Sequence, residues 1–112
     1  RFCFIVDCVY GIARIIHSPD LIANPINLGS SELISIDDLV SMVEEIAGIK
    51  LTRTYDPNQP KGVAGRNSDN TFIQKVLGWE PKIPLTAGMR KTYEWIAEQY
   101  ADRKAGKRVV ED

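Results

Sequence analysis

The sequence predicts an α/β fold of mixed helices and short strands. Three observations support this class. Apolar residues recur at helical spacing in several segments, shorter apolar or alternating runs lie between those segments, and Gly or Pro marks most of the connections. The expected order is β-α-β-α-β-α-α with short connections, which is typical of a mixed α/β layer.

The first part of the chain predicts two strands and one helix. The apolar run at residues 2–6 should form a short buried strand, and Asp7 should cap a helix over residues 7–17. Residues 26–28 should form a second strand, closed by residues 29–31, Gly-Ser-Ser. That closing run is either a plain turn or a loop near a ligand, and its composition favours the turn. The helix is predicted because Val9, Ile12, Ala13 and Ile16 are apolar and recur at helical spacing.

The clearest helical signal follows the second strand. Ser35 and Asp38 resemble a capping box, and Gly48 suits the position just after a helix C-terminus. Residues 49–55 then alternate between apolar and polar side chains, which predicts a third strand. The Pro- and Gly-containing loop at residues 56–65 joins this strand to the next helix, and such loops often carry function.

The last part of the chain predicts two helices and a tail. Ser68 or Asp69 can cap a helix that Gly78 ends. A longer helix should run over residues 86–104. The polar residues 105–112 predict a disordered tail.

Composition limits the possible partners. The chain has 112 residues and a net charge of −1, from 14 basic and 15 acidic side chains, which argues against a nucleic-acid partner. Apolar runs are too short to span a membrane. Cys3 and Cys8 predict neither a disulfide nor a zinc site, and they indicate a reducing, cytoplasmic setting. Because the chain begins on a strand-like run without Met, we interpret it as a fragment of a longer protein.

Motifs that would carry catalysis are missing. The sequence has no G-x-G-x-x-G or P-loop run, which are the fingerprints of dinucleotide and nucleoside-triphosphate sites. His17 is the only histidine and is expected at a helix end. Tyr100 and Lys104 are spaced as a Tyr-x-x-x-Lys pair, but they fall at the frayed end of the last helix. We therefore expect no catalytic residue, no cofactor-binding residue and no metal ligand on this chain.

A binding site is the remaining possibility, and it centres on residues 62–70, GVAGRNSDN. The guanidinium of Arg66 offers five donors in a planar fork that suits phosphate. A helix N-terminus beside it could add unpaired backbone N–H groups. Asn67, Ser68 and Asp69 offer short polar contacts next to it. These residues alone leave two alternatives open, ligand binding and plain helix capping, and spacing favours capping.

A wider resemblance adds to this interpretation. The run GVAGRNSDNTFIQKVLGWEPKIPLTAGMRKTYEWI resembles the C-terminal region of the extended short-chain dehydrogenases/reductases (SDRs). These are NAD-dependent nucleotide-sugar epimerases and dehydratases. The runs FCFIVDCVYGI and PINLGSSELISIDDL fit the same family, so the resemblance covers roughly residues 1–104.

The resemblance implies a two-lobed parent enzyme, an isomerase and homodimer. One lobe is a Rossmann domain that binds NAD and carries a Tyr-x-x-x-Lys pair, and a smaller C-terminal lobe closes over the nucleotide sugar. Residues 1–104 would be that smaller, substrate-binding lobe with its connecting strand and helix, and the Rossmann core would be absent. NAD would bind to the missing lobe and not to this chain alone.

The same resemblance implies that the chain is the nucleotide-sugar-binding portion of an epimerase and is not catalytically competent by itself. Two alternatives remain open: a stand-alone nucleotide-sugar or anion-binding module, and a self-associating fragment without activity.

Individual residues can be placed on the family's pattern. Arg66 falls on the Arg that contacts the substrate phosphate, with Asn67, Ser68 and Asp69 beside it. Arg1 takes the middle position of the family's Arg-x-Phe pattern and is kept as a further substrate-binding candidate. The sequence departs from the family by having Ala64 where a second Arg is common.

Overall fold

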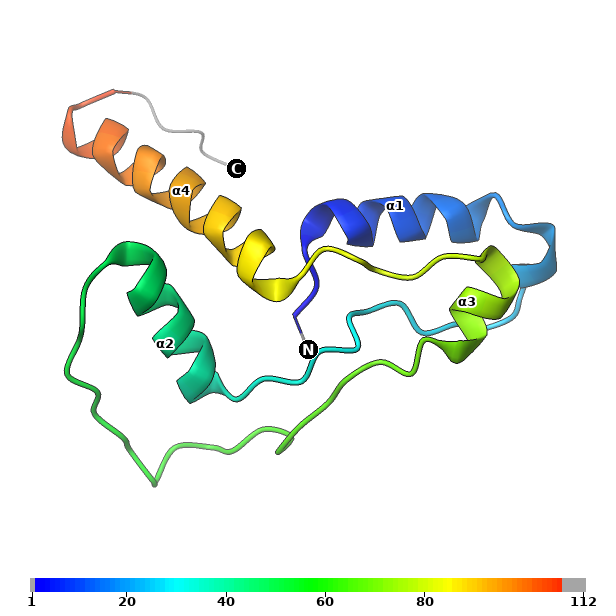
Figure 1. Cartoon of the computed structure of the whole chain (residues 1–112), viewed down its shortest axis with the longest axis horizontal. Coiled ribbons are helices and arrows are strands. Elements are labelled where there is room, and N and C mark those ends of the chain that lie inside the picture. The colour runs from blue at the N-terminus through cyan, green and yellow to red at the C-terminus, as the bar shows by residue number, and fades with distance from the viewer. Residues whose placement is uncertain (1, 108–112) are drawn as a thin grey trace.

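A computed structural model describes residues 2–107, and these form four α-helices and one 3₁₀ turn (Figure 1). The elements in chain order are α1 (Ile5–Ile16), η1 (Pro19–Leu21), α2 (Ile36–Ala47), α3 (Thr71–Leu77) and α4 (Leu85–Lys104). No strand forms among the described residues, so the strands predicted for residues 2–6, 26–28 and 49–55 are wrong. The α/β expectation is corrected to a helical fold with long extended connections. The end of the predicted tail, residues 108–112, lies outside the described residues.

The extended connections are not strands, because within residues 2–107 they form no ladder with a second extended segment. A strand requires a ladder of backbone hydrogen bonds to a second extended segment. The connections at residues 24–34 and 63–69 are joined by a backbone bond from the N–H of Ser68 to the C=O of Ser30, at 3.1 Å. Local alternation of apolar and polar residues therefore produced extended backbone here without producing a sheet.

The beginning of α1 also differs from the prediction. Ile5 and Val6, expected in a strand, form the first helical turn, and Phe4 rather than Asp7 is the N-cap residue. Asp7 is buried within the helix, and its Oδ2 accepts the backbone N–H groups of Lys82 (2.8 Å) and Ile83 (2.7 Å). The carboxylate thus joins two distant segments instead of capping its own helix.

The other helix ends agree with the sequence. Ser35 caps α2 as predicted, because its Oγ accepts the N–H of Asp38 at 3.0 Å. Gly48 ends that helix with φ 67°, and Gly78 ends α3 with φ 61°, which are left-handed conformations that glycine adopts at low cost. The long final helix begins at Leu85, one residue before the predicted start.

Side chains, rather than strand pairing, fix residues 49–55 to α2. Arg53 lies 2.7 Å from Asp37 Oδ1 and 2.7 Å from Glu44 Oε2, and the Tyr55 hydroxyl donates to Asp37 Oδ1 at 2.7 Å. The N–H of Leu51 donates to Glu44 Oε1 at 2.9 Å. We call these five residues the Arg53 cluster. It holds the extended segment along one face of α2.

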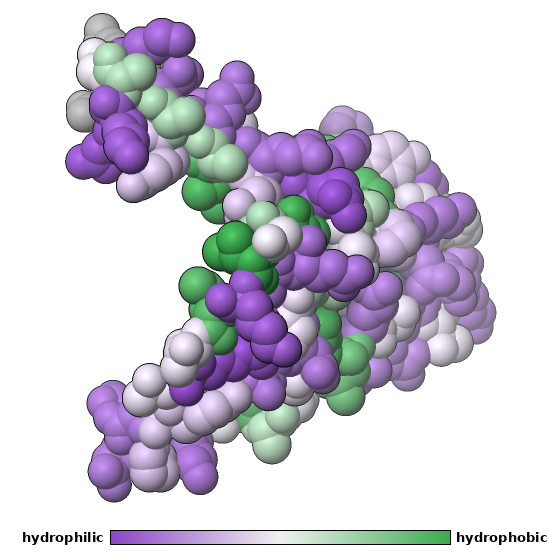
Figure 2. Space-filling view, turned by 60° about the vertical axis from the view of Figure 1, so that its left-hand side comes forward, coloured by the Kyte–Doolittle hydropathy of each residue, from purple (hydrophilic) through white to green (hydrophobic). Residues whose placement is uncertain are grey.

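The described residues bury few apolar side chains. Leu21 and Ile73 are the buried hydrophobic residues. The radius of gyration is 17.7 Å, whereas a compact domain of this length has about 13 Å. Two arms project from the molecule, and hydrophobic side chains gather in the hollow between them (Figure 2). In the described part of the chain, no helix combines the length with the apolar character that crossing a membrane requires.

Candidate functional site

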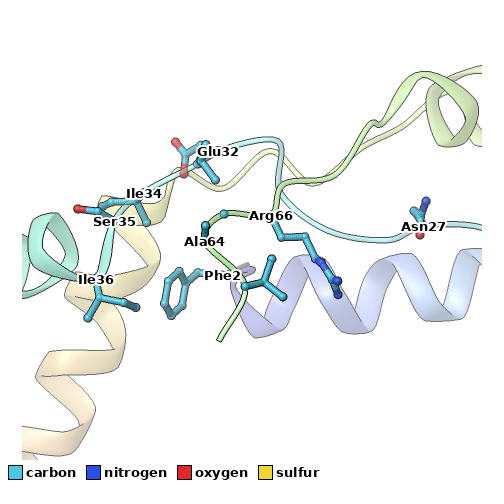
Figure 3. A pocket seen from close by; sticks show the side chains of 11 residues that line it. Phe2, Asn27, Glu32, Ile34, Ser35, Ile36, Ala64 and Arg66 are labelled. Carbon is cyan, nitrogen blue, oxygen red and sulfur yellow. The ribbon is translucent and has the colours of Figure 1, made fainter. Parts of the chain in front are cut away.

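A pocket of about 700 Å³ forms where three separate stretches of chain meet (Figure 3). Asn27 and residues 32–36 belong to the connection that leads into α2, residues 63–66 belong to the predicted binding stretch, and Phe2 comes from the N-terminal segment. Apolar side chains and polar groups share the lining. The lining residues are Phe2, Asn27, Glu32, Leu33, Ile34, Ser35, Ile36, Val63, Ala64, Gly65 and Arg66. Such a mixed lining suits a ligand with both apolar and charged parts.

Hydrogen bonds dock the predicted binding stretch onto residues 29–31. The N–H of Ser68 donates to Ser30 O, and the Asn67 side chain donates to Ser31 O at 3.3 Å. The Asn70 side chain donates to Gly29 O at 3.1 Å. Residues 29–31 therefore lie against the binding stretch and lead into the pocket lining, so the Gly-Ser-Ser run is a loop beside the candidate site.

Arg66 is the pocket's cation. Its side chain is exposed, and among residues 2–107 it makes neither a hydrogen bond nor an ion pair. Figure 3 shows this side chain extending from the loop that carries Ala64. Two other arginines are engaged: Arg53 binds two carboxylates, and Arg14 donates to Leu77 O at 2.6 Å. The fork of Arg66 is therefore available to an anion, and bidentate phosphate contacts match its geometry.

A carboxylate shares the pocket with Arg66. Glu32 Oε2 accepts the backbone N–H of Leu85 at 2.8 Å, and Glu32's own N–H donates to Ser30 Oγ at 3.1 Å. These bonds fix the acid at the beginning of α4, where a negative charge is favoured by the helix dipole. Sequence reasoning did not single out Glu32 or Phe2, because only the folded chain brings them to the binding stretch.

The polar residues that follow Arg66 support the loop rather than line the pocket. Ser68 and Asn70 are buried, and Ser68 Oγ and Asn70 Oδ1 have no hydrogen-bond partner in the described part of the chain. Asp69 Oδ1 accepts from the Thr71 hydroxyl (2.7 Å) and the Thr71 N–H (3.0 Å). The Thr71 hydroxyl and then its N–H lower the pKa of Asp69, so this carboxylate stays ionised at the beginning of α3.

The beginning of α3 differs in detail from the predicted phosphate site. The helix is one of seven residues, its N-cap is Asn70 rather than Ser68 or Asp69, and its first N–H is taken by Asp69. The N–H of Thr71 is therefore already paired within the chain, and the contribution of the other first-turn N–H groups to phosphate binding stays a prediction. Of the predicted site residues, Arg66 lines the pocket, Asn67, Ser68 and Asp69 do not, and Arg1 lies outside the described residues.

This part of the chain does not fit the dinucleotide NAD. A Rossmann site needs a glycine-rich turn between a strand and a helix, at the carboxyl edge of a parallel sheet. The sequence has no such glycine run, and residues 2–107 form no strand.

Comparison with known proteins gives several relatives, although no protein-family model matches the chain. It is 42% identical over 104 residues to GDP-mannose 3,5-epimerase of Arabidopsis thaliana, covering 93% of this chain and 27% of that enzyme. It is 40% identical over 103 residues to GDP-mannose 3,5-epimerase 1 of Oryza sativa subsp. japonica, covering 92% and 26%.

A more distant relative is the probable GDP-L-fucose synthase 1 of Oryza sativa subsp. japonica. The two are 33% identical over 79 residues, which are 70% of this chain and 24% of that protein. The chain thus spans about a quarter of the length of the curated relatives that it matches.

Proposed function

Because the chain belongs to the extended SDR family of nucleotide-sugar epimerases, we propose that it is the substrate-binding portion of such an enzyme. Residues 1–104 act as the lobe that holds the nucleotide sugar, and GDP-mannose is the first substrate to test, given the names of the relatives at 40% identity and above. The observation that carries the proposal is Arg66, a cation without a partner among the described residues and on the wall of a 700 Å³ pocket.

Arg66 binds the diphosphate in this proposal. Two parallel N–H groups of a guanidinium match two phosphate oxygens, which fixes both the position and the orientation of the ligand. Phe2 and the aliphatic lining offer an apolar surface to the rest of the nucleotide sugar. Holding the sugar in one place is a proximity effect, and it prepares chemistry that other residues perform.

The chemistry itself requires groups that this chain does not supply. Tyr100 and Lys104 lie near the C-terminal end of α4, and neither lines the pocket. NAD does not fit the described residues, so we assign it to the remainder of a complete epimerase. The chain alone binds substrate and does not turn it over.

Titration of the isotope-labelled 112-residue chain with GDP-mannose, followed by NMR, tests the proposal. We expect weak binding, with a Kd of about 1 mM, because this chain supplies only one part of the substrate cleft of a complete epimerase. Amide signals of residues 63–66 should shift with the ligand, and Arg66→Ala should remove the shifts. Arg103→Ala is the matched control, since it deletes an exposed Arg on α4. Equal loss in both variants, or no shift in residues 63–66, would refute the assignment.

A stand-alone binding module is the second candidate, and one observation favours it: the pocket is formed entirely within this chain. This alternative predicts micromolar affinity for GDP or GDP-mannose without any added polypeptide. The same titration separates the two, because they differ in Kd by about a thousandfold.

A further inference from the structure

The pocket that contains Arg66 has a single acid in its lining. Among the 11 lining residues in the described part of the chain, Glu32 is the one carboxylate and Arg66 is the one basic side chain. Within residues 2–107 the two form no ion pair with each other. Figure 3 shows their side chains extending in different directions. The pocket therefore presents a positive group and, separately, a negative group to a ligand.

The Glu32 side chain is held in place by one of its two oxygens. Oε2 accepts the N–H of Leu85 at 2.8 Å, and the backbone N–H of Glu32 donates to Ser30 Oγ at 3.1 Å. Oε1 accepts no hydrogen bond from the residues that the structure describes, and Glu32 is exposed. One oxygen thus fixes the carboxylate at the beginning of α4, and the other is open to a ligand.

The chemistry of this open oxygen decides which ligand groups it favours. An ionised carboxylate accepts hydrogen bonds and donates none. Hydroxyl groups surround a hexose ring, so an uncharged sugar can offer Oε1 a donor in many orientations. A carboxylate on the sugar offers no donor and adds a second negative charge beside Glu32, which is repulsive. The same oxygen therefore attracts an uncharged sugar and disfavours an acidic one.

We propose that Glu32 makes the site selective for nucleotide sugars with an uncharged hexose over those with a uronic acid. This inference rests on the proposed function, in which Arg66 holds the diphosphate. The sugar ring is bonded directly to that diphosphate, so it shares the pocket with it and reaches Glu32. Selectivity then comes from a repulsive element against the wrong ligand as well as from a hydrogen bond to the right one.

The expected size of the effect follows from the exposure of Glu32. Because water reaches this carboxylate, its repulsion of a second carboxylate in the pocket is moderate, and we expect about a tenfold difference in Kd at low salt. Added salt should reduce the difference, since exposed charges are screened. The repulsion between Glu32 and the diphosphate is common to both kinds of ligand, so it cancels in the ratio of their dissociation constants.

NMR titration of the isotope-labelled 112-residue chain with GDP-mannose and with GDP-mannuronic acid tests the proposal. The two probes differ at C6 of the sugar, which is a hydroxymethyl group in the first and a carboxylate in the second. We expect GDP-mannuronic acid to have the higher Kd, by about tenfold, and Glu32→Gln should bring the ratio close to one. The amide oxygen in this variant can still accept the N–H of Leu85, so the contact with α4 is kept.

Glu45→Gln is the matched control, because Glu45 is an exposed acid on α2 that does not line the pocket, and this variant should keep the tenfold ratio. Equal affinity of the natural chain for the two probes overturns the role of Glu32 and leaves the assignment of Arg66 standing. A ratio that survives Glu32→Gln, or that falls equally in Glu45→Gln, overturns that role as well. Signals of residues 63–66 that respond to neither probe would overturn the proposed function together with this inference.

Discussion

Oδ2 of Asp7 accepts the backbone N–H of Ile83 at 2.7 Å, and so links α1 to the segment that enters α4. The same oxygen accepts the N–H of Lys82. One buried side chain therefore provides the acceptor for two backbone N–H groups that lie outside any helix or strand. In a chain with little buried apolar surface, such a contact between distant segments has a large share in fixing the fold.

The first prediction concerns this contact. Asp7→Ala leaves the N–H groups of Lys82 and Ile83 without an acceptor, which should lower the free energy of unfolding by about 1–3 kcal/mol. Urea denaturation followed by circular dichroism measures the change. Asp20→Ala is the control, because the Asp20 side chain is exposed and this change should have no measurable effect. Equal stability of the two variants would contradict the role given to Asp7.

The second prediction concerns the close approach at Gly11. A Cβ on this residue would lie 2.5 Å from Leu28 Cδ1 and 3.0 Å from the Trp79 ring. Gly11→Ala should therefore destabilise the chain by about 1–3 kcal/mol, despite the better helix propensity of Ala. Gly62→Ala faces open space and should be neutral. Thermal unfolding of both variants provides the comparison, and a stabilised Gly11→Ala would contradict the packing described.

The third prediction concerns the N-cap of α2. Ser35 Oγ accepts the Asp38 N–H at 3.0 Å and donates to Asp38 Oδ2 at 2.6 Å. Ser35→Ala should cost about 1 kcal/mol and increase amide exchange in the first turn of α2. Ser31→Ala, an exposed serine outside any helix, should leave exchange in α2 unchanged.

The fourth prediction is a pH dependence from the Arg53 cluster. The Tyr55 hydroxyl and then Arg53 hold the pKa of Asp37 below its ordinary 3.8. The Leu51 N–H and then Arg53 hold the pKa of Glu44 below 4.5. Because both values are lowered by folding, the folded chain binds fewer protons than the unfolded chain. The resulting stability is present above the ordinary carboxyl pKa and is lost as pH falls toward the lowered values.

The urea midpoint should therefore fall as the pH is lowered through this range. Arg53→Met should flatten the dependence, since it removes one shared cause of both shifts. Arg103→Met, in the last turn of α4, should leave the pH dependence of the urea midpoint unchanged. An unchanged slope in Arg53→Met would show that the cluster does not control the titration.

The fifth prediction separates charge from geometry at the binding pocket. Arg66→Lys keeps a cation but loses the planar fork, so GDP-mannose should bind more weakly than to the natural chain and more tightly than to Arg66→Ala. Added salt should weaken binding to the natural chain, because the site is exposed. Full affinity in Arg66→Lys would mean that charge alone holds the phosphate.

The sequence by itself determined the helix ends of α2, the C-terminus of α3 and the extent of α4. Ser35, Gly48 and Gly78 act on neighbours within a few residues, so their effects can be read locally. The family was also recognised from the sequence, since its motifs are contiguous runs. Arg66 was predicted as a binding residue in the same way, from its place in one such run.

Tertiary structure alone decided how these parts meet. Whether residues 49–55 form a strand depends on an extended neighbour elsewhere in the chain. Here the side chains of the Arg53 cluster bind this segment to α2 instead. Asp7 was predicted to cap its own helix, but its carboxylate instead accepts hydrogen bonds from backbone N–H groups that lie 75 and 76 residues further along the chain. Arg53 is engaged and Arg66 is open for the same reason: the partners of a guanidinium are set by what folding brings near it, which no local pattern encodes.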